Sequence, residues 1–457
     1  MRVIICGAGR VGVGIARRLV REEMDVTVID QSKDLIRAVA ERLDVRGVVG
    51  NGSFPETLDE AGARDADMII AVTYSDEVNM IACQIAHSLF DVPTKIARVR
   101  AQEYLDPTYS DLFTRNNMPI DVIISPEREV SQAIMQRLAA PGAFDVKTFA
   151  DDRVWAVGIR LGEDCPVINT PLRQVAELFP DLKITIVGVA RDEKMWRTHA
   201  DDQLDVGDEI YFVADRSDVQ RALEIMGAAA SQARRIILVG GGNIGLFVAK
   251  GLEELGSMKI RMVERDRARA EFAAEELERT VVLQGDGLDR AMLREAGVVD
   301  AETVVAVTDN DQVNILASVV AKREGARRAL ALINDKDYGP ISETVGIDRF
   351  VDPRSTTIST ILQHIRRGRI KGVYSLYDGK AELIDAVALE TSPLVDKPLR
   401  DANLPDGVMI GAVVRDDAVI MPTSDTVIAP GDRVILMAMR ENVKAVEQMF
   451  RVSIEFF

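Results

Sequence analysis

The feature that most constrains the fold of this chain is a glycine signature, G-x-G-x-x-G, that occurs twice. It reads Gly7-Ala8-Gly9-Arg10-Val11-Gly12 near the start and Gly240-Gly241-Gly242-Asn243-Ile244-Gly245 past the middle. Each copy lies between a short apolar strand and a predicted helix. In that setting the first glycine makes a tight turn, the second lets the backbone approach a pyrophosphate, and the third packs helix against strand. The phosphate binds the free N–H groups at the helix start. The chain is therefore predicted to contain two nucleotide-binding units.

An acidic residue follows each signature at the spacing of a ribose-binding acid. Asp30 lies eighteen residues past Gly12, and Glu264 lies nineteen past Gly245, each at the end of an apolar strand. An acid about 20 residues on accepts hydrogen bonds from the adenosine ribose hydroxyls, and its charge repels a 2′-phosphate. The alternative is that the glycines only close strand–helix corners.

The repeat extends well beyond the glycines. The offset between the copies is 233 residues at Gly7 and Gly240, and 235 residues at Asn79 and Asn314. So constant a spacing indicates a tandem duplication. Strands that alternate with helices predict a parallel sheet wound on both faces.

The fold class expected is α/β, with two Rossmann-like doubly wound parallel-sheet domains, each followed by a small β-rich α+β domain. A chain of 457 residues is too long for one core. The domains expected are a first Rossmann-like nucleotide-binding domain over 1–125, a connector helix over 126–145, a first β-rich domain over 146–228, a second Rossmann-like domain over 233–353, a connector helix over 354–371 and a second β-rich domain over 372–457. A basic stretch of small residues over 227–235 is expected to be the linker between the halves.

Local signals mark the ends of these domains. Pro126 and Pro353 each mark the end of a nucleotide-binding copy, and predicted helices over 130–138 and 358–365 follow them. Each β-rich domain is expected to end in a helix that starts at a capping-type residue, Ser217 in the first and Asn442 in the second.

Composition excludes several classes of partner. A net charge of −17, from 73 acidic and 56 basic residues, argues against nucleic acid and anionic lipid. No uninterrupted apolar run reaches the roughly 18 residues of a membrane span, and the first strand begins too near Met1 for a signal peptide. The three cysteines predict neither a disulfide framework nor a metal site and fit a reducing cytoplasm. Paired acids such as Asp151-Asp152 could bind a cation, but turn solvation explains them, so no metal is expected.

With these motifs placed, the sequence resembles the TrkA family, the regulatory subunits of bacterial Trk potassium-uptake systems, which contain two "regulator of potassium conductance" (RCK) units. The resemblance covers essentially the whole chain and includes the stretches over 73–79 and 96–100 besides the glycines. It implies a cytoplasmic protein, peripheral on the inner face of the membrane, that assembles on a separate potassium-conducting subunit. It also implies binding of NAD(H) and/or ADP/ATP to gate transport, and a homo-oligomer of four chains that supplies a ring of eight units.

The resemblance also implies two cofactor-binding sites. The first comprises Gly7, Ala8, Gly9, Arg10, Val11, Gly12, Asp30, Asn51, Thr73, Tyr74 and Arg98. The second comprises Gly240, Gly241, Gly242, Asn243, Ile244, Gly245, Glu264, Asp286, Thr308 and Asp309. Thr73 and Thr308 are expected where the strand order reverses and ligands bind in the crevice.

The two copies differ in their cations. Arg10 can reach phosphate as a forked donor, but Asn243 replaces it, and Arg98 aligns with Leu332. This difference predicts that ADP or ATP binds the first copy more tightly. The alternative for Arg98 is a solvated residue at a strand end. Asp30 is predicted to select NAD(H) or adenosine nucleotides over NADP(H).

The alternative function is an NAD-dependent oxidoreductase. Hydride transfer needs a general acid or base beside the nicotinamide. The three histidines, His87, His199 and His364, have no counterparts in the other repeat. We therefore expect a regulatory binding protein, not an enzyme, and no catalytic residue.

Overall fold

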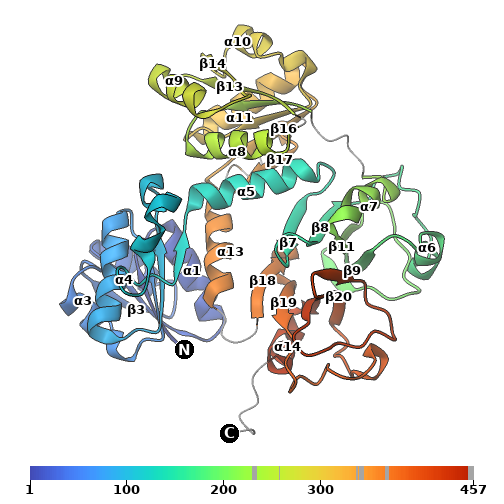
Figure 1. Ribbon diagram of the computed structural model, residues 1–457, viewed down its shortest axis with the longest axis horizontal. Helices are drawn as coiled ribbons and strands as arrows, with labels where there is room; N and C mark the ends of the chain where they lie inside the picture. Colours follow the sequence, from blue (N-terminus) through green and yellow to red (C-terminus); the bar gives the residue numbers. More distant parts are fainter. Residues whose placement is uncertain (229–233, 257, 336–337, 339–343, 366–369, 451–457) are drawn as a thin grey trace. The chain divides into compact units, whose positions relative to one another are not determined.

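The computed structural model describes residues 1–228, 234–256, 258–335, 338, 344–365 and 370–450 (Figure 1). They form two compact units, and each unit takes residues from both halves of the sequence. The first contains residues 1–132 and 235–362, and the second contains residues 133–234 and 363–457. The expected linker over 227–235 and the end of the connector over 354–371 fall partly outside the described residues.

The first sheet of the first unit has six parallel strands in the order β3-β2-β1-β4-β5-β6. The strands are β1 (Arg2–Cys6), β2 (Asp25–Asp30), β3 (Arg46–Val49), β4 (Met68–Ala71), β5 (Thr94–Arg98) and β6 (Val122–Ile124). The four residues of β4 are all buried, which suits a strand with both faces covered. The strand order reverses between β1 and β4, as the sequence predicts.

The second sheet of this unit repeats the first, with the strand order β14-β13-β12-β15-β16-β17. The strands are β12 (Arg235–Val239), β13 (Lys259–Glu264), β14 (Val281–Gln284), β15 (Thr303–Ala306), β16 (Arg328–Leu332) and β17 (Arg349–Val351). All the strand pairs in this sheet are parallel. The predicted duplication and the doubly wound fold are therefore confirmed.

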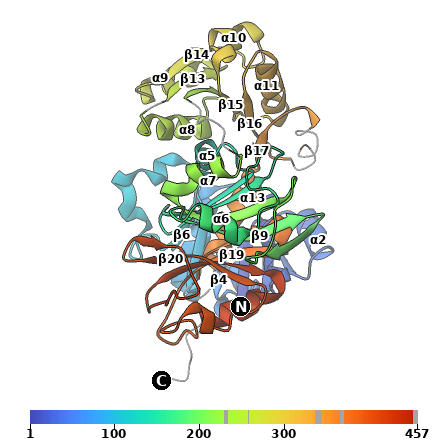
Figure 2. The ribbon, with the colours of Figure 1, turned by 90° about the vertical axis from the view of Figure 1, so that its right-hand side faces the viewer.

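Helices cover both faces of each of these sheets. Those of the first copy are α1 (Arg10–Arg21), α2 (Lys33–Ala40), α3 (Pro55–Glu60) and α4 (Asp76–Phe90), and those of the second are α8 (Asn243–Glu254), α9 (Arg267–Glu276), α10 (Arg290–Glu295) and α11 (Asp311–Arg323). On one face Leu58 of α3 and Cys83 of α4 pack against Ile4 and Ile29 of the sheet. In the second copy α8 and α9 lie on one side of the strands, and α10 and α11 lie on the other (Figure 2).

The two connector helices extend beyond the predicted helical stretches over 130–138 and 358–365 but are shorter than the connectors expected over 126–145 and 354–371. They are α5 (Pro126–Ala139) and α13 (Pro353–Ile365), and each begins at its proline. Proline suits the first helical position because it lacks only an N–H that would be unpaired there, and its fixed φ already fits the helix. Pro126 and Pro353 are therefore the first residues of the helices, whereas the predicted helical stretches begin only at 130 and 358.

The second unit contains two antiparallel sheets, as expected for the β-rich domains. The first has the order β10-β9-β11-β8-β7 and the second the order β18-β19-β22-β20-β21. The first sheet comprises β7 (Asp145–Phe149), β8 (Val154–Arg160), β9 (Ile184–Arg191), β10 (Lys194–Arg197) and β11 (Glu209–Asp215), and the second comprises β18 (Ile370–Leu376), β19 (Ala381–Val387), β20 (Val408–Arg415), β21 (Ala418–Ile420) and β22 (Arg433–Met439). When the second order is read from its other end, the two orders match, with β8, β9 and β11 corresponding to β19, β20 and β22. The duplication therefore extends to this unit.

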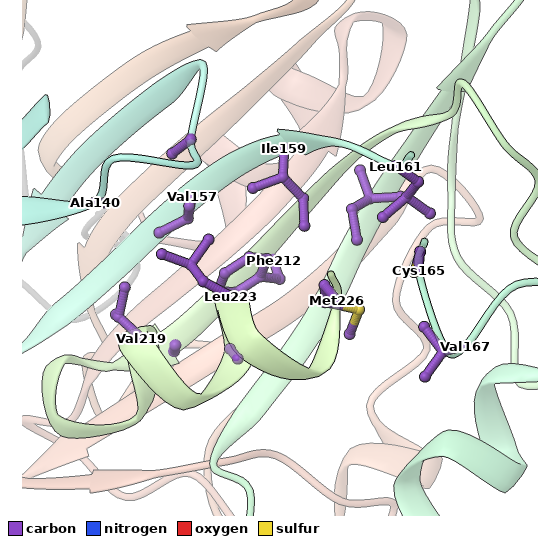
Figure 3. Packing of buried hydrophobic residues seen from close by; sticks show 14 of the residues in the cluster. Ala140, Val157, Ile159, Leu161, Cys165, Val167, Phe212, Val219, Leu223 and Met226 are labelled. Atoms are coloured by element: carbon purple, nitrogen blue, oxygen red, sulfur yellow. The ribbon is translucent and has the colours of Figure 1, made fainter. Parts of the chain in front are cut away.

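Apolar side chains fill both faces of the first of these sheets. On one face, Phe212 of β11 packs with Val157 and Ile159 of β8 and with Leu223 of α7 (Val219–Ile225), as Figure 3 shows. On the other face a core cluster joins side chains of both sheets, including Val187 and Met437. The three cysteines of the chain are buried and free.

A repeated ion pair fixes the turns at Gly207-Asp208 and Gly431-Asp432 of these domains. Asp208 accepts hydrogen bonds from Arg191 Nε at 2.6 Å and Nη2 at 2.7 Å, and Asp432 accepts them from Arg415 at 2.9 and 2.7 Å. Both aspartates are buried. The turns are thus fixed by a forked charge-assisted contact as well as by glycine.

Of the expected helix caps of these domains, Ser217 is wrong, whereas Asn442 occupies the N-cap position of its helix but forms no capping hydrogen bond. A short 3₁₀ turn precedes α7, and the side chain that caps this turn is Asp215, which accepts from the N–H of Ser217 at 2.9 Å. No side chain caps α14 (Val443–Met449), and Asn442 belongs to the 3₁₀ turn before it. In the first domain Asp215, two residues before Ser217, caps the 3₁₀ turn that precedes α7, which the local sequence pattern does not resolve.

Candidate nucleotide-binding crevices

The two glycine turns have the geometry that the signature predicts. Gly7 and Gly240 adopt φ of +114° and +112°, where a side chain would be strained. A Cβ on Gly12 would lie 1.9 Å from the carbonyl oxygen of Gly7. A Cβ on Gly9 would meet no heavy atom within 4 Å. The first and third glycines are thus required by packing, whereas the second leaves space in front of the helix.

Helices α1 and α8 start with open N–H groups. Their caps are Gly9 and Gly242, both extended, and neither supplies a side-chain hydrogen bond. The first N–H groups of a helix have no partner within the helix and carry its positive dipole end. Each glycine turn therefore presents N–H donors suited to a phosphate.

The acids Asp30 and Glu264 hold the turns to the second strands. Asp30 Oδ2 accepts from the N–H of Ala8 at 2.8 Å, and its Oδ1 accepts from the N–H of Ser32 at 2.9 Å. Glu264 repeats this with the N–H groups of Gly241 at 2.6 Å and Asp266 at 2.7 Å. A carboxylate has about four acceptor positions, so each acid retains capacity for a ribose hydroxyl.

Two buried asparagines, which the sequence analysis did not select, organise the switch points. Asn79 Oδ1 accepts from the N–H of Thr73 at 2.8 Å and from its Oγ1 at 2.7 Å. Its Nδ2 donates to the carbonyls of Thr73 at 3.1 Å and Arg98 at 2.9 Å. This amide therefore joins the loop after β4 to the end of β5.

Asn314 repeats the arrangement in the second copy. Its Oδ1 accepts from the N–H of Thr308 at 2.8 Å and from its Oγ1 at 2.6 Å, and its Nδ2 donates to Leu332 O at 2.9 Å. The sequence indicates this shared arrangement only through the spacing, because an asparagine follows both Thr73 and Thr308 by six residues.

Arg98 lies at the switch point of the first copy. Its Nη2 donates to the carbonyl of Thr73 at 2.7 Å. Burial lowers the pKa of Arg98, and the nearby charge of Arg100 lowers it further. Arg100 pairs with the buried Glu127 at 3.0 Å. Tyr74 is 87% exposed, and its ring centroid lies 6.0 Å from the Arg100 guanidinium.

A cavity of about 970 Å³ opens at the second crevice. Of the residues predicted for the first site, Arg10, Val11 and Arg98 line this cavity. Of those predicted for the second site, the cavity is lined by Gly240, Gly242, Asn243, Ile244, Glu264, Asp286, Thr308 and Asp309. Arginines of the first copy therefore face the same cavity as the second glycine turn, which no comparison of aligned residues could indicate.

The remaining predicted residues have other places in the structure. Those that do not line this cavity are Gly7, Ala8, Gly9, Gly12, Asp30, Asn51, Thr73, Tyr74, Gly241 and Gly245. Asn51 Oδ1 accepts from the N–H of Ser53 at 3.0 Å and so shapes its own turn. Asp286 does the same with the N–H of Leu288 at 2.9 Å, although it also lines the cavity.

The sequence analysis also missed two arginines of the second crevice. Arg265 and Arg269 line the cavity beside Glu264. They align with Gln31 and Leu35 of the first copy at the offset of 234 residues that relates Asp30 to Glu264. The inference that the second copy has lost its cations is therefore incomplete, because other positions supply them.

Fold and crevices together define a class of protein with two Rossmann-type nucleotide-binding domains in tandem, each joined to a small α+β domain. The model of the TrkA-N domain matches residues 3–126 and 236–353, and that of the TrkA-C domain matches residues 156–227 and 383–451. The chain therefore belongs to the TrkA family.

Relatives agree with this assignment, and solved structures share the fold. The chain is 53% identical to the Trk system potassium uptake protein TrkA of Azorhizobium caulinodans and 40% identical to that of Halomonas elongata, with 100% of each chain covered. The fold is similar to the GsuK RCK domain, at a TM-score of 0.59 and 17% identity, over 98% of this chain and 94% of that one. It is equally similar, at 0.59 and 17%, to the GsuK channel bound to NAD, over 98% and 78%.

Within the described ranges, no helix has the length and apolar character needed to cross a bilayer. The same residues contain no group of three or more His, Cys, Asp or Glu side chains that could hold a metal ion.

Proposed function

We propose that this protein is the nucleotide-binding regulatory subunit of a Trk-type potassium uptake system. The observation that carries the proposal is the paired crevice, in which an open helix start, an acid that holds the glycine turn and a switch-point threonine recur in both copies. Membership of the TrkA family supports potassium transport as the process. The NAD-bound GsuK channel, which shares the fold, supports a nucleotide as the ligand.

The ligands proposed are NAD(H) and/or ADP/ATP, at the sites named above. In this proposal the protein is cytoplasmic, lies on the inner face of the membrane as a homotetramer, and contacts a separate potassium-conducting subunit. A nucleotide regulates such an assembly only if it binds two arrangements of the protein with different affinity. We propose no enzymatic turnover, because an oxidoreductase needs an acid or base near the nicotinamide.

Potassium flux into vesicles that contain the membrane subunit and this protein tests the proposal. We expect flux to change when NADH, NAD, ADP or ATP is added, and to change less with Gly9→Ala, whose methyl group would project into the open space before α1. Flux that is indifferent to every nucleotide would contradict regulation. Consumption of NADH in the same vesicles would favour the oxidoreductase alternative.

A further inference from the structure

The two crevices differ directly after their ribose-facing acids. In the first copy Asp30 is followed by Gln31, and Leu35 lies at the start of α2. In the second copy Glu264 is followed by Arg265, and Arg269 lies in the first turn of α9. The duplication has thus placed two guanidinium groups where the first copy has an amide and a methyl-bearing side chain.

Both arginines face the second crevice. They line the cavity together with Glu264 and the glycine turn. Arg269 Nη2 lies 3.4 Å from the side-chain oxygen of Asn243, which is the first residue of α8. It also lies 3.8 Å from the position that a Cβ on Gly242 would take. The side chain of Arg269 therefore extends from α9 to the open start of α8.

The acids around these arginines are engaged elsewhere. Glu264 accepts backbone N–H groups with both oxygens, from Gly241 and Asp266. Asp266 Oδ1 accepts the N–H of Arg269 at 2.9 Å as the cap of α9. Within the described part of the chain, neither Arg265 nor Arg269 forms an ion pair with a carboxylate. Their charged donors are therefore available to an anion in the crevice.

The position of these donors indicates which anion they suit. The acid at the end of the second strand marks the adenosine ribose, and in sites that take a 2′-phosphate a nearby arginine accommodates it. The single charge of Glu264 repels a 2′-phosphate, but the two guanidinium groups of Arg265 and Arg269, which line the same cavity, outweigh that charge. Guanidinium groups present planar pairs of N–H donors that match phosphate oxygens. Asn243 in the glycine turn carries no charge, so the arginines place positive charge at the ribose side of the second crevice.

We propose that Arg265 and Arg269 allow the second crevice to accept an adenine nucleotide with a phosphate on its adenosine ribose, as in NADP(H). The first crevice, with Asp30, Gln31 and Leu35, excludes such a nucleotide. This inference rests on the proposed function, because it assumes that the crevices bind adenine nucleotides at all. It gives the two copies different ligands and provides a reason why both glycine turns are retained.

Calorimetric titration of the full chain with NADPH, NADH, and adenosine 2′,5′-bisphosphate tests the inference. We expect NADPH and the bisphosphate to bind at one site per chain. The variant R265Q/R269L, which installs the residues of the first copy, is expected to lower the NADPH-to-NADH affinity ratio by about tenfold or more, the effect of losing one or two charged hydrogen bonds. The reciprocal variant Q31R/L35R is expected to raise that ratio by adding a second NADPH site.

Arg267→Gln is the matched control. Arg267 is exposed, pairs with Glu271 at 2.8 Å and does not line the cavity, so the ratio should stay as in the wild type. A ratio unchanged in R265Q/R269L, or NADH binding with no NADPH binding, would overturn this inference and leave the proposed function intact. A chain that binds none of NADH, ADP and NADPH would overturn both.

Discussion

The side-chain amide of Asn79 makes three hydrogen bonds to Thr73, through the N–H, the hydroxyl and the carbonyl of that residue. A fourth bond, to Arg98 O, joins the neighbouring strand. With both acceptor positions and both donors used, the amide has no remaining capacity. This contact, repeated by Asn314 and Thr308, fixes the loop that borders each crevice.

Removal of this amide should destabilise the first unit. Asn79 is 0% exposed, so Asn79→Ala removes, within a partly buried region, the partner of the Thr73 N–H and of the Arg98 carbonyl. An unpaired buried group costs about 1–3 kcal/mol, and we expect a loss of about 2 kcal/mol or more in urea unfolding. Ser88→Ala, an exposed change on the same helix, should stay within about 0.5 kcal/mol. Equal effects of the two changes would contradict the role assigned to Asn79.

The glycines of the first turn should respond differently to alanine. Gly12→Ala places a Cβ 1.9 Å from the backbone oxygen of Gly7, so the turn cannot stay as it is and the thermal midpoint should fall. Gly9→Ala meets nothing and should leave that midpoint unchanged. Its methyl group occupies the approach to the open N–H groups of α1, so ADP should bind the first site about tenfold more weakly. Differential scanning fluorimetry and ADP titration separate the two effects, and a stable Gly12→Ala protein would argue against the close packing.

The ion pair of the second β-rich domain should be sensitive to which partner is removed. Asp432 has a side chain 2% exposed, whereas that of Arg415 is 39% exposed. Arg415→Met leaves a buried carboxylate without its cation, and breaking a buried pair in this way costs about 3–5 kcal/mol. Asp432→Asn leaves the charge of Arg415 able to reach water and should cost less. Chemical unfolding of both variants shows which change lowers the free energy of unfolding more. A larger loss for Asp432→Asn than for Arg415→Met would contradict this reasoning.

Sequence reasoning succeeds here where a property repeats along the chain. The glycines, the acids and the apolar strands recur at a near-constant offset, so strand order and crevice position follow from them. Asn79 escaped selection because it reads as an ordinary helix residue, and only the fold turns its amide toward Thr73. Arg265 and Arg269 could have been found by comparing the segments after Asp30 and Glu264. The approach of Arg10 to the second crevice depends on tertiary structure, which no local pattern contains.

Glu253 of α8 should make the stability of the second copy depend on pH. Its carboxylate accepts from the N–H groups of Glu278 at 3.1 Å, Arg279 at 2.8 Å and Thr280 at 2.7 Å, and from the hydroxyl of Thr280 at 2.7 Å. Burial alone would raise the pKa of Glu253, but the hydrogen bonds from Thr280 and these N–H groups lower it overall. A lowered folded-state pKa means that the ionised form stabilises the fold above the ordinary pKa of glutamate. That stability is lost as the pH falls through the folded-state pKa.

Glu253→Gln should therefore be less stable than the wild type by about 1–2 kcal/mol at pH 7, because its hydrogen bonds are no longer charge-assisted. The difference should shrink once the pH falls below the ordinary glutamate value of about 4.3, since the wild type then loses its own charge. Urea unfolding at intervals from pH 7 down to about pH 2 measures it, since this range passes through both the ordinary and the lowered pKa of Glu253. Glu254→Gln, an exposed change at the next position, should show no such trend. A difference that stays constant or widens in acid would show that the carboxylate charge is not what holds the segment before β14.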